Sequence, residues 1–254
     1  MMSQPGPVQN RILMHLPTAA FNLLQPHLHR VQLHRHEILQ EQNALVRKVY
    51  FIESGIASMV AHTERDGRIE VGLIGRFGFV GVPVVLGTMR ATARCIMEMR
   101  GEALEIRPIF LRQSMDKHSA LRQKLLNYVQ ALLVQHSQTV LCTALHRLEE
   151  RLARWLLLAH DRLDDNVVPL THELFATTLG VRRAGVTTAL TNFEDMGIVR
   201  KRRGAVEIMN RPLLERNACE CYRIISGEYR RLIDTDPHAL PAPRKKKCKS
   251  LSYV

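Results

Sequence analysis

Two adjacent arginines and the small residues that follow them form the most suggestive chemical group in the sequence. Arg182 and Arg183 precede Ala184, Thr187 and Thr188. An arginine can donate two hydrogen bonds to O6 and N7 of guanine, and the smaller side chains can contact neighbouring base edges. At the start of a helix, these residues could therefore read DNA in the major groove. As an alternative, both arginines contact only phosphates, which carry no sequence information.

A second basic group follows at Arg200, Lys201, Arg202 and Arg203. Such a cluster can neutralise phosphates, which makes the affinity for DNA fall steeply with salt, or it can belong to a solvated hairpin. The whole chain has 36 Lys and Arg against 24 Asp and Glu, a formal charge of +12. This balance favours a polyanionic partner, with nucleic acid ahead of a membrane surface. Part of the charge lies in a basic C-terminal tail.

The thiols do not show a metal-binding pattern. No CxxC pair is present, and two of the cysteines are separated by only one residue, closer than the usual spacing in zinc sites. We therefore expect reduced thiols, no disulfide framework, no iron-sulfur cluster, no metal and no other cofactor. The five cysteines are Cys95, Cys142, Cys219, Cys221 and Cys248.

Helical periodicity and turn residues explain how the arginines could be positioned. An amphipathic helix is expected over residues 148–163, and Thr171 can cap a second helix that stops at Gly180. A short turn leads to a third helix through residues 186–193, followed by two strands over residues 198–209. Three helices and a hairpin in this order are the organisation of a winged helix-turn-helix.

The first half of the chain has a different pattern. Residues 1–17 are polar and rich in proline, and we expect them to be flexible. Residues 38–106 contain short apolar runs separated by turns such as Asp66-Gly67. Several short strands at close intervals predict an all-β barrel or jelly roll.

A long helix is predicted between these two regions, because residues 118–145 contain no glycine or proline. It has two apolar stripes, so it needs two partners, namely its own barrel and a twin helix. The alternative is a helix buried entirely within one chain. We predict that the first stripe forms the dimer interface, through Leu121, Leu125, Tyr128, Leu132, Thr139 and Cys142. The second stripe consists of Leu126, Val129, Leu133, Val140 and Ala144.

Three segments in the same order resemble the Crp/Fnr family of transcription regulators. Residues 170–215 resemble the family's DNA-binding domain, and HRLEERLARWLL from His146 is similar to the helix before it. EILQEQNALVRKVYFIESGIASMV resembles the family's cyclic-nucleotide-binding-type barrel. The resemblance covers roughly residues 20–220, and it implies that Arg183 reads bases and that Thr171 belongs to the DNA-binding surface. It also implies double-stranded DNA, a second copy of the chain and RNA polymerase as partners.

The expected fold is therefore α+β: an N-terminal β jelly-roll barrel, a long dimerisation helix and a C-terminal winged helix-turn-helix. The expected boundaries are a flexible N-terminus (1–17), a barrel sensor domain (18–110), the dimerisation helix (111–145), the DNA-binding domain (146–217) and a C-terminal extension with the basic tail (218–254).

The resemblance also locates an effector site in the barrel. Family members that bind cyclic AMP hold the ribose with a Gly-Glu pair and the phosphate with an Arg-Ser/Thr-Ala run. Here Val82 replaces the glutamate, and a valine cannot accept hydrogen bonds from ribose hydroxyls. We therefore expect a degenerate cyclic-nucleotide site with an unknown effector. The corresponding residues are Gly81, Val82, Pro83, Arg90, Thr92 and Ala93.

Other classes of protein fit the sequence less well. The longest apolar stretch, residues 77–87, is too short to span a membrane, and the first residues lack a signal-peptide pattern, so we expect a cytoplasmic protein. No catalytic triad, Walker or Rossmann motif is present, which argues against an enzyme. One alternative stays open. In the expected reading helix, Ala184 and Thr188 replace the family's usual glutamate and second arginine, and Gly185 lies inside the helix. Together with Val82 in the barrel, these departures would also fit a sensory or adaptor protein whose barrel binds a ligand and whose helix no longer reads bases.

Overall fold

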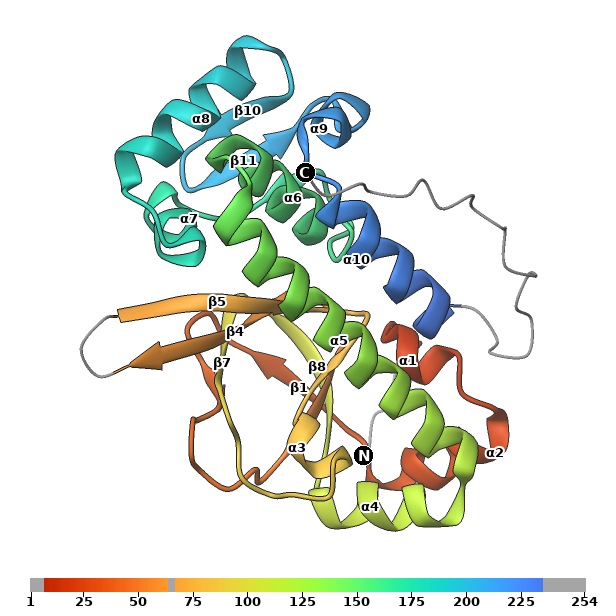
Figure 1. The fold of residues 1–254 in the computed structure, drawn as a ribbon. Helices are drawn as coiled ribbons and strands as arrows, with labels where there is room; N and C mark the ends of the chain where they lie inside the picture. Colours follow the sequence, from red (N-terminus) through yellow and green to blue (C-terminus); the bar gives the residue numbers. More distant parts are fainter. Residues whose placement is uncertain (1–6, 64–66, 235–254) are drawn as a thin grey trace, which may run out of the picture.

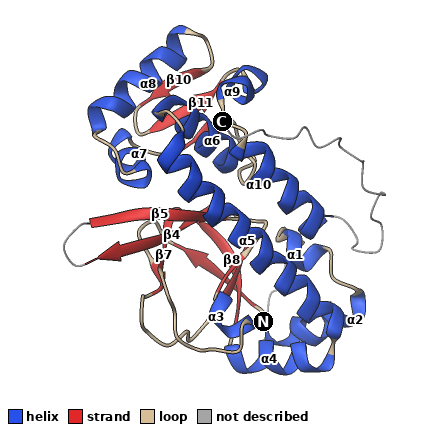
Figure 2. Cartoon of the chain, viewed as in Figure 1, coloured by secondary structure: helices blue, strands red, loops and turns tan. Residues whose placement is uncertain are grey.

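The strand-rich half of the chain forms two antiparallel sheets that face each other. The computed structural model describes residues 7–63 and 67–234 (Figures 1 and 2). The sheets have the orders β1-β8-β3-β6 and β2-β7-β4-β5, and their apolar side chains fill the space between them. This confirms the predicted jelly-roll barrel. The strands are β1 (His29–Leu33), β2 (Ile38–Gln40), β3 (Val49–Ile52), β4 (Ile56–Thr63), β5 (Gly67–Ile74), β6 (Phe79–Val80), β7 (Arg94–Met99) and β8 (Gly101–Ile106).

The N-terminal segment is attached to the barrel, so the prediction of a flexible segment over residues 1–17 is wrong for residues 7–17. Asn10 is fully buried, and its side-chain nitrogen Nδ2 donates to the carbonyl oxygens of Ile52 and Gly78 at 2.8 Å each. Its side-chain oxygen caps α1 (Arg11–Met14), which buries Ile12. Two further helical segments, α2 (Thr18–Leu24) and η1 (Gln25–His27), lead into β1.

After the barrel, the chain turns into α4 (Pro108–Lys117) and then into the long helix α5 (Ser119–Leu145). The predicted helix over residues 118–145 is therefore confirmed. A short helix, α3 (Val82–Val85), connects β6 to the loop before β7. Helix α5 runs diagonally along the barrel and reaches the C-terminal domain (Figure 1).

The structure contradicts the predicted dimer interface. The first stripe of α5 packs on its own chain: Leu121, Leu125 and Tyr128 are fully buried. The ring of Tyr128 lies 4.7 Å from that of Phe79 and fits because residue 78 is a glycine, where a Cβ would overlap the Tyr128 ring. The other members of the predicted interface are also engaged within the chain. They are Leu132, which is buried, Thr139, which accepts a hydrogen bond from Arg154, and Cys142, which is buried beside Cys219.

The second stripe faces outward except at Val129, which is buried in the core. Leu126, Leu133 and Val140 follow one another at intervals of seven residues and are 37%, 60% and 68% exposed. Leu145, at the end of the same helix, is 72% exposed. A heptad-spaced apolar row on an exposed helix is the pattern of a helix that pairs with another helix.

The C-terminal extension covers part of the surface of α5 that the barrel leaves open. After α9 (Arg211–Asn217) come α10 (Cys221–Tyr229) and a π-helical turn, η2 (Arg230–Asp234), which lie along α5 (Figure 1). Lys124 of α5 donates to the carbonyl oxygen of Ile233 at 2.6 Å. The predicted basic tail, residues 244–249, lies outside the described residues, as does Asp66 of the predicted turn.

Removing one buried side chain of α10 should destabilise the whole chain. Ile225 is fully buried, and its replacement by alanine should cost about 2–5 kcal/mol of unfolding free energy, because a cavity forms between α10 and α5. The melting temperature should fall by roughly 5–15 °C in a thermal scan. Ile224, its neighbour, is 40% exposed, so Ile224→Ala is the matched control and should change the melting temperature little. Equal shifts for the two variants would contradict this packing.

The C-terminal domain has the predicted order of three helices and a hairpin. Its short strand β9 adds to the hairpin to give a sheet of order β10-β11-β9. None of the helices in the described part of the chain is long and apolar enough to cross a membrane. The remaining elements are α6 (Leu148–His160), β9 (Val167–Val168), α7 (His172–Leu179), α8 (Arg183–Asp195), β10 (Val199–Arg202) and β11 (Ala205–Ile208).

Candidate nucleic-acid interface

Helices α7 and α8 form a helix-turn-helix whose turn is set by local sequence. The Thr171 hydroxyl accepts a hydrogen bond from the backbone N–H of Leu174 at 3.2 Å and so caps α7, as predicted. Gly180 ends α7 in the left-handed conformation, with φ of 63°. The N–H of Val181 donates back to Ala176 at 3.0 Å, and α8 begins at Arg183.

Helix α8 has one face in the domain core and one face in solvent. Val186, Ala189, Leu190 and Phe193 are buried, because they pack towards α6 and α7. Gly185 lies where α8 approaches α6, since a Cβ there would be 3.1 Å from the Leu148 side chain. All five residues predicted to contact bases lie on the exposed face or at its N-terminal edge: Arg182, Arg183, Ala184, Thr187 and Thr188.

The two arginines at the start of α8 are exposed to solvent and can contact a ligand without a large rearrangement. Arg183 makes one loose ion pair, with Nε 4.0 Å from a carboxylate oxygen of Glu173, and both side chains are about 70% exposed. An exposed pair of this kind contributes about 0–1 kcal/mol, so releasing it costs little. Arg182 forms no ion pair with the residues that the structure describes.

The four basic residues of the wing are in different environments. Lys201 is tied to α8: its ammonium is 2.9 Å from Glu194 and 3.0 Å from the Thr191 hydroxyl. The hydrogen bond from Lys201 lowers the pKa of Glu194 below its usual value. Lys201 therefore fixes the hairpin against α8. Two others, Arg200 and Arg202, share the carboxylate of Glu207.

The tip of the wing carries the wing cation that is most available for a phosphate. Arg203 is exposed and forms no ion pair within residues 7–63 and 67–234. It precedes Gly204, which has φ of 71° and allows the tight turn between β10 and β11. The basic residues of the predicted contact set therefore differ in how strongly the protein already binds them.

The predicted effector residues are in different environments. Arg90 and Thr92 are exposed, and the Arg90 guanidinium donates to the carbonyl oxygen of Asn43 at 2.5 Å. Gly81 has φ of 116° and is closed off by Val49, because a Cβ there would be 2.8 Å from its methyl group. The remaining members are Val82, which is half-buried, and Pro83 and Ala93, which are buried.

Comparison with known proteins gives a consistent result for both domains. Residues 30–118 match the model of the cyclic nucleotide-binding domain, and residues 150–217 match that of the Crp-like helix-turn-helix domain. Together these matches span more than half of the chain, in the order found in Crp/Fnr regulators. The chain belongs to the Crp/Fnr family. A search of curated proteins gave no significant match.

Solved structures of Crp/Fnr regulators share the fold. A putative Crp/Fnr regulator from Eubacterium rectale has a TM-score of 0.62 at 17% identity and covers 84% of this chain and 97% of its own. FixK2 from Bradyrhizobium japonicum has a TM-score of 0.63 at 14% identity, with coverage of 76% and 98%. A CRP-family regulator from Thermus thermophilus has a TM-score of 0.61 at 19% identity, with coverage of 74% and 96%.

The junction between the barrel and the DNA-binding domain of this Crp/Fnr protein contains a buried carboxyl group. Glu70 of β5 accepts hydrogen bonds from Trp155 Nε1 of α6 at 2.7 Å and from the Ser58 hydroxyl. The pKa of Glu70 is raised to about 7, mainly by burial and to a smaller extent by the nearby Glu98, although the two hydrogen bonds and the charge of Arg154 act in the opposite direction. Glu70 therefore changes charge near neutral pH.

Stability should depend on pH through Glu70. Its pKa is higher in the folded than in the unfolded chain, so the folded state binds the proton more tightly, and stability is lost as the pH rises from about 4.5 to above 7. The loss is about 3 kcal/mol for this shift. In chemical denaturation between pH 5 and 8, Glu70→Gln should remove this component, while the exposed control Asp165→Asn should retain it. A Glu70→Gln variant with the wild-type pH dependence would contradict this assignment.

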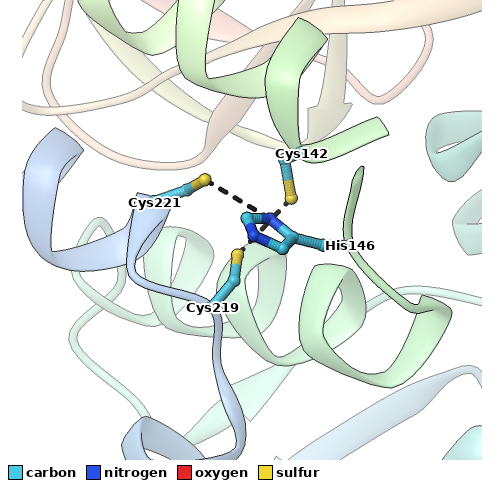
Figure 3. Close-up of side chains that lie close together, drawn as sticks. All are labelled: Cys142, His146, Cys219 and Cys221. Atoms are coloured by element: carbon cyan, nitrogen blue, oxygen red, sulfur yellow. Dashed lines mark hydrogen bonds between the residues drawn. The ribbon is translucent and has the colours of Figure 1, made fainter. Parts of the chain in front are cut away.

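Sequence reasoning missed one group of residues altogether. The expectation of no metal site relied on the spacing of the cysteines, but folding brings Cys142, His146, Cys219 and Cys221 together (Figure 3). Their potential ligand atoms all lie within 4.8 Å of one another. The only signals in the sequence are the separation of four residues between Cys142 and His146 and the closely spaced pair near the C-terminus. Neither signal predicts that the two segments meet.

Proposed function

We propose that this Crp/Fnr protein is a sequence-specific regulator that binds an inverted-repeat operator as a homodimer. One observation carries the proposal: α8 presents Arg182, Arg183, Ala184, Thr187 and Thr188 to solvent while its opposite face is held in the core. A helix so fixed can enter the major groove with its N-terminal residues towards the bases. Arg203 of the wing is available for the flanking phosphate backbone.

The exposed stripe of α5 supports the dimer in this proposal. Pairing Leu126, Leu133 and Val140 with the same residues of a second chain would bury three apolar side chains that are now 37–68% exposed. A parallel pair of α5 helices relates the two copies of α8 by a two-fold axis. The operator would then consist of two half-sites roughly one DNA turn, about 34 Å, apart.

The barrel is proposed to bind an effector other than cyclic AMP. Val82 offers no acceptor for ribose hydroxyls, and Arg90 is turned towards the Asn43 carbonyl oxygen, so neither residue supplies the contacts that cyclic AMP requires. We propose the cytoplasm as the location, because the partner is DNA, and RNA polymerase as a further partner, because the family regulates transcription. We do not assign an enzymatic activity.

Selection of bound genomic fragments by the purified full-length protein, followed by footprinting, tests the proposed function. The expected result is one inverted repeat that is protected at two half-sites about one turn apart. Equal affinity for the selected sequence and for a scrambled duplex at moderate salt would contradict sequence-specific binding. Protection of a single half-site by one chain would contradict the dimer.

A further inference from the structure

The four residues grouped in Figure 3 come from two segments that are far apart in the sequence. Cys142 is in the last turn of α5, and His146 follows four residues later at the end of the helix. Cys219 and Cys221 lie just before and at the start of α10. The Sγ atoms of Cys142 and Cys219 are 3.5 Å apart, and the Sγ atom of Cys221 is 3.6 Å from His146 Nδ1.

These separations match those of ligands around a single tetrahedral ion. Zinc binds cysteine sulfur at about 2.3 Å and histidine nitrogen at about 2.0–2.1 Å, so neighbouring ligand atoms lie roughly 3.5–3.8 Å apart. The two distances above are already in or near that range. The widest separation in the group, at most 4.8 Å, has to close by only about 1 Å. Small rotations of side chains can supply this change.

The backbone explains why the donors converge. Residues four apart on a helix lie on the same face, so Cys142 and His146 point to the same side of the end of α5. The N–H of His146 still donates to the carbonyl oxygen of Cys142 at 3.1 Å, which holds this last turn in place. Cys142, Cys219 and Cys221 are at most 6% exposed, and His146 is half-buried. The site is therefore closed to solvent on most sides.

The charges around the group favour a bound thiolate site. Three thiolates, a neutral histidine and a divalent ion have a net charge of −1. Two guanidinium groups of α6, those of Arg151 and Arg154, interact electrostatically with Cys142. Neither forms an ion pair with a carboxylate of the described residues, and the Nε atom of each is buried without a hydrogen-bond partner. Both cations would offset the negative charge of the site.

We propose that Cys142, His146, Cys219 and Cys221 form a binding site for a single zinc ion. The ion would join the end of α5 to the start of α10, next to the point where the DNA-binding domain begins. A mononuclear site fits better than an iron-sulfur cluster, because a cluster distributes its thiolates over several irons and so holds them further apart. A disulfide between Cys142 and Cys219 would not explain why Cys221 and His146 lie at the same point.

Elemental analysis of the full-length protein purified with thiols kept reduced is the first test. We expect one zinc ion per chain, or one cobalt ion after exchange. Cobalt should show the intense visible bands of tetrahedral coordination and the near-ultraviolet absorption of thiolate bonds. Cys219→Ser and His146→Ala should weaken cobalt binding by more than the roughly 10–100-fold that loss of an outer partner of a metal site costs. Cys95→Ala, which removes a buried thiol of the barrel strand β7, is the matched control.

Several results would overturn the proposal. These are a reduced wild-type chain that binds no zinc or cobalt, cobalt spectra unchanged in Cys219→Ser, iron with acid-labile sulfide, or a disulfide in place of the metal. The wild-type measurements do not depend on the folding of any variant. Circular dichroism of each variant shows whether a loss of binding reflects loss of the fold.

A consequence for DNA binding rests on the proposed function and is tested separately. Because the ion would fix the junction before α6, a chelator should lower the melting temperature and the operator affinity together, and zinc should restore both. A chain that holds one zinc ion but binds no operator would refute the proposed function and leave the metal site standing. Unchanged operator affinity of the chelated, metal-free chain would refute this consequence alone.

Discussion

Replacing Leu133 by glutamate should convert the proposed dimer into monomers and nearly abolish operator binding. Leu133 is 60% exposed and lies in the middle of the outward stripe of α5, so in a two-fold pair it faces the same residue of the second chain. Two buried, unpaired carboxylates of like charge would cost several kcal/mol. Sedimentation at micromolar concentration should show single chains. Operator affinity should fall about 100-fold or more, because linked half-sites gain roughly that factor from being bound together.

Because Leu133 lies on the surface of its own chain, the effect of Leu133→Glu on dimerisation can be distinguished from an effect on folding. Since Leu133 does not take part in the core of its own chain, circular dichroism of Leu133→Glu should match that of the wild type. Leu45, in the loop between β2 and β3, is 59% exposed, so Leu45→Glu makes the same chemical change away from α5. It should leave both the mass and the affinity unchanged. A Leu133→Glu chain that still sediments as a dimer would mean that another surface pairs.

The sequence predicted that α5 has two apolar stripes but assigned them to the wrong partners. Periodicity identifies which residues share a helix face, but both stripes have the same spacing and similar residues. The assignment depends on α10, whose Tyr222, Ile225 and Tyr229 are buried and lie on one helix face. This helix follows the recognised domain and covers part of α5. The spacing of three and four residues between Tyr222, Ile225 and Tyr229 was the signal in the sequence that could have predicted this additional amphipathic helix.

The barrel and the helix-turn-helix were predictable because their signals are local. Alternating apolar residues indicate strands, Gly180 ends α7, and Thr171 caps it, all within a few residues of the feature that they produce. The exposure of Arg182 and Arg183 also follows, because the buried positions of α8 repeat with helical spacing. Local patterns therefore predicted which face of α8 is exposed without any knowledge of packing between domains.

Contacts between distant segments were not predictable in this way. The Asn10 side chain is held by hydrogen bonds to the carbonyl oxygens of Ile52 and Gly78, although the polar, proline-rich sequence around it predicts a flexible segment. The four possible metal ligands come from two segments, and each segment by itself lacks a zinc spacing. In both cases the determining interactions are formed only once the chain has folded.

Replacing Arg183 by alanine should remove base reading at one position of each half-site. One bidentate contact with guanine contributes about 1–3 kcal/mol, and the proposed dimer would make this contact twice. Affinity for the selected operator should therefore fall by a factor of roughly 30 or more. Affinity for a scrambled duplex should change much less. Binding to operators mutated at single positions should show relaxed preference at the position that Arg183 contacts. Competition gel-shift assays at fixed salt measure all three quantities.

Arg203→Ala is the control that separates binding to phosphates from binding to bases. Because Arg203 lies at the tip of the wing without an ion pair to the described residues, its removal should weaken binding to all duplexes alike. The slope of log affinity against log salt should decrease by about one for each phosphate that the variant no longer neutralises. If Arg183→Ala gives this same uniform pattern, then Arg183 binds only phosphate. If it changes neither affinity nor preference, then Ala184, Gly185 and Thr188 reflect a helix that no longer reads bases, and the sensory adaptor hypothesis replaces the regulator.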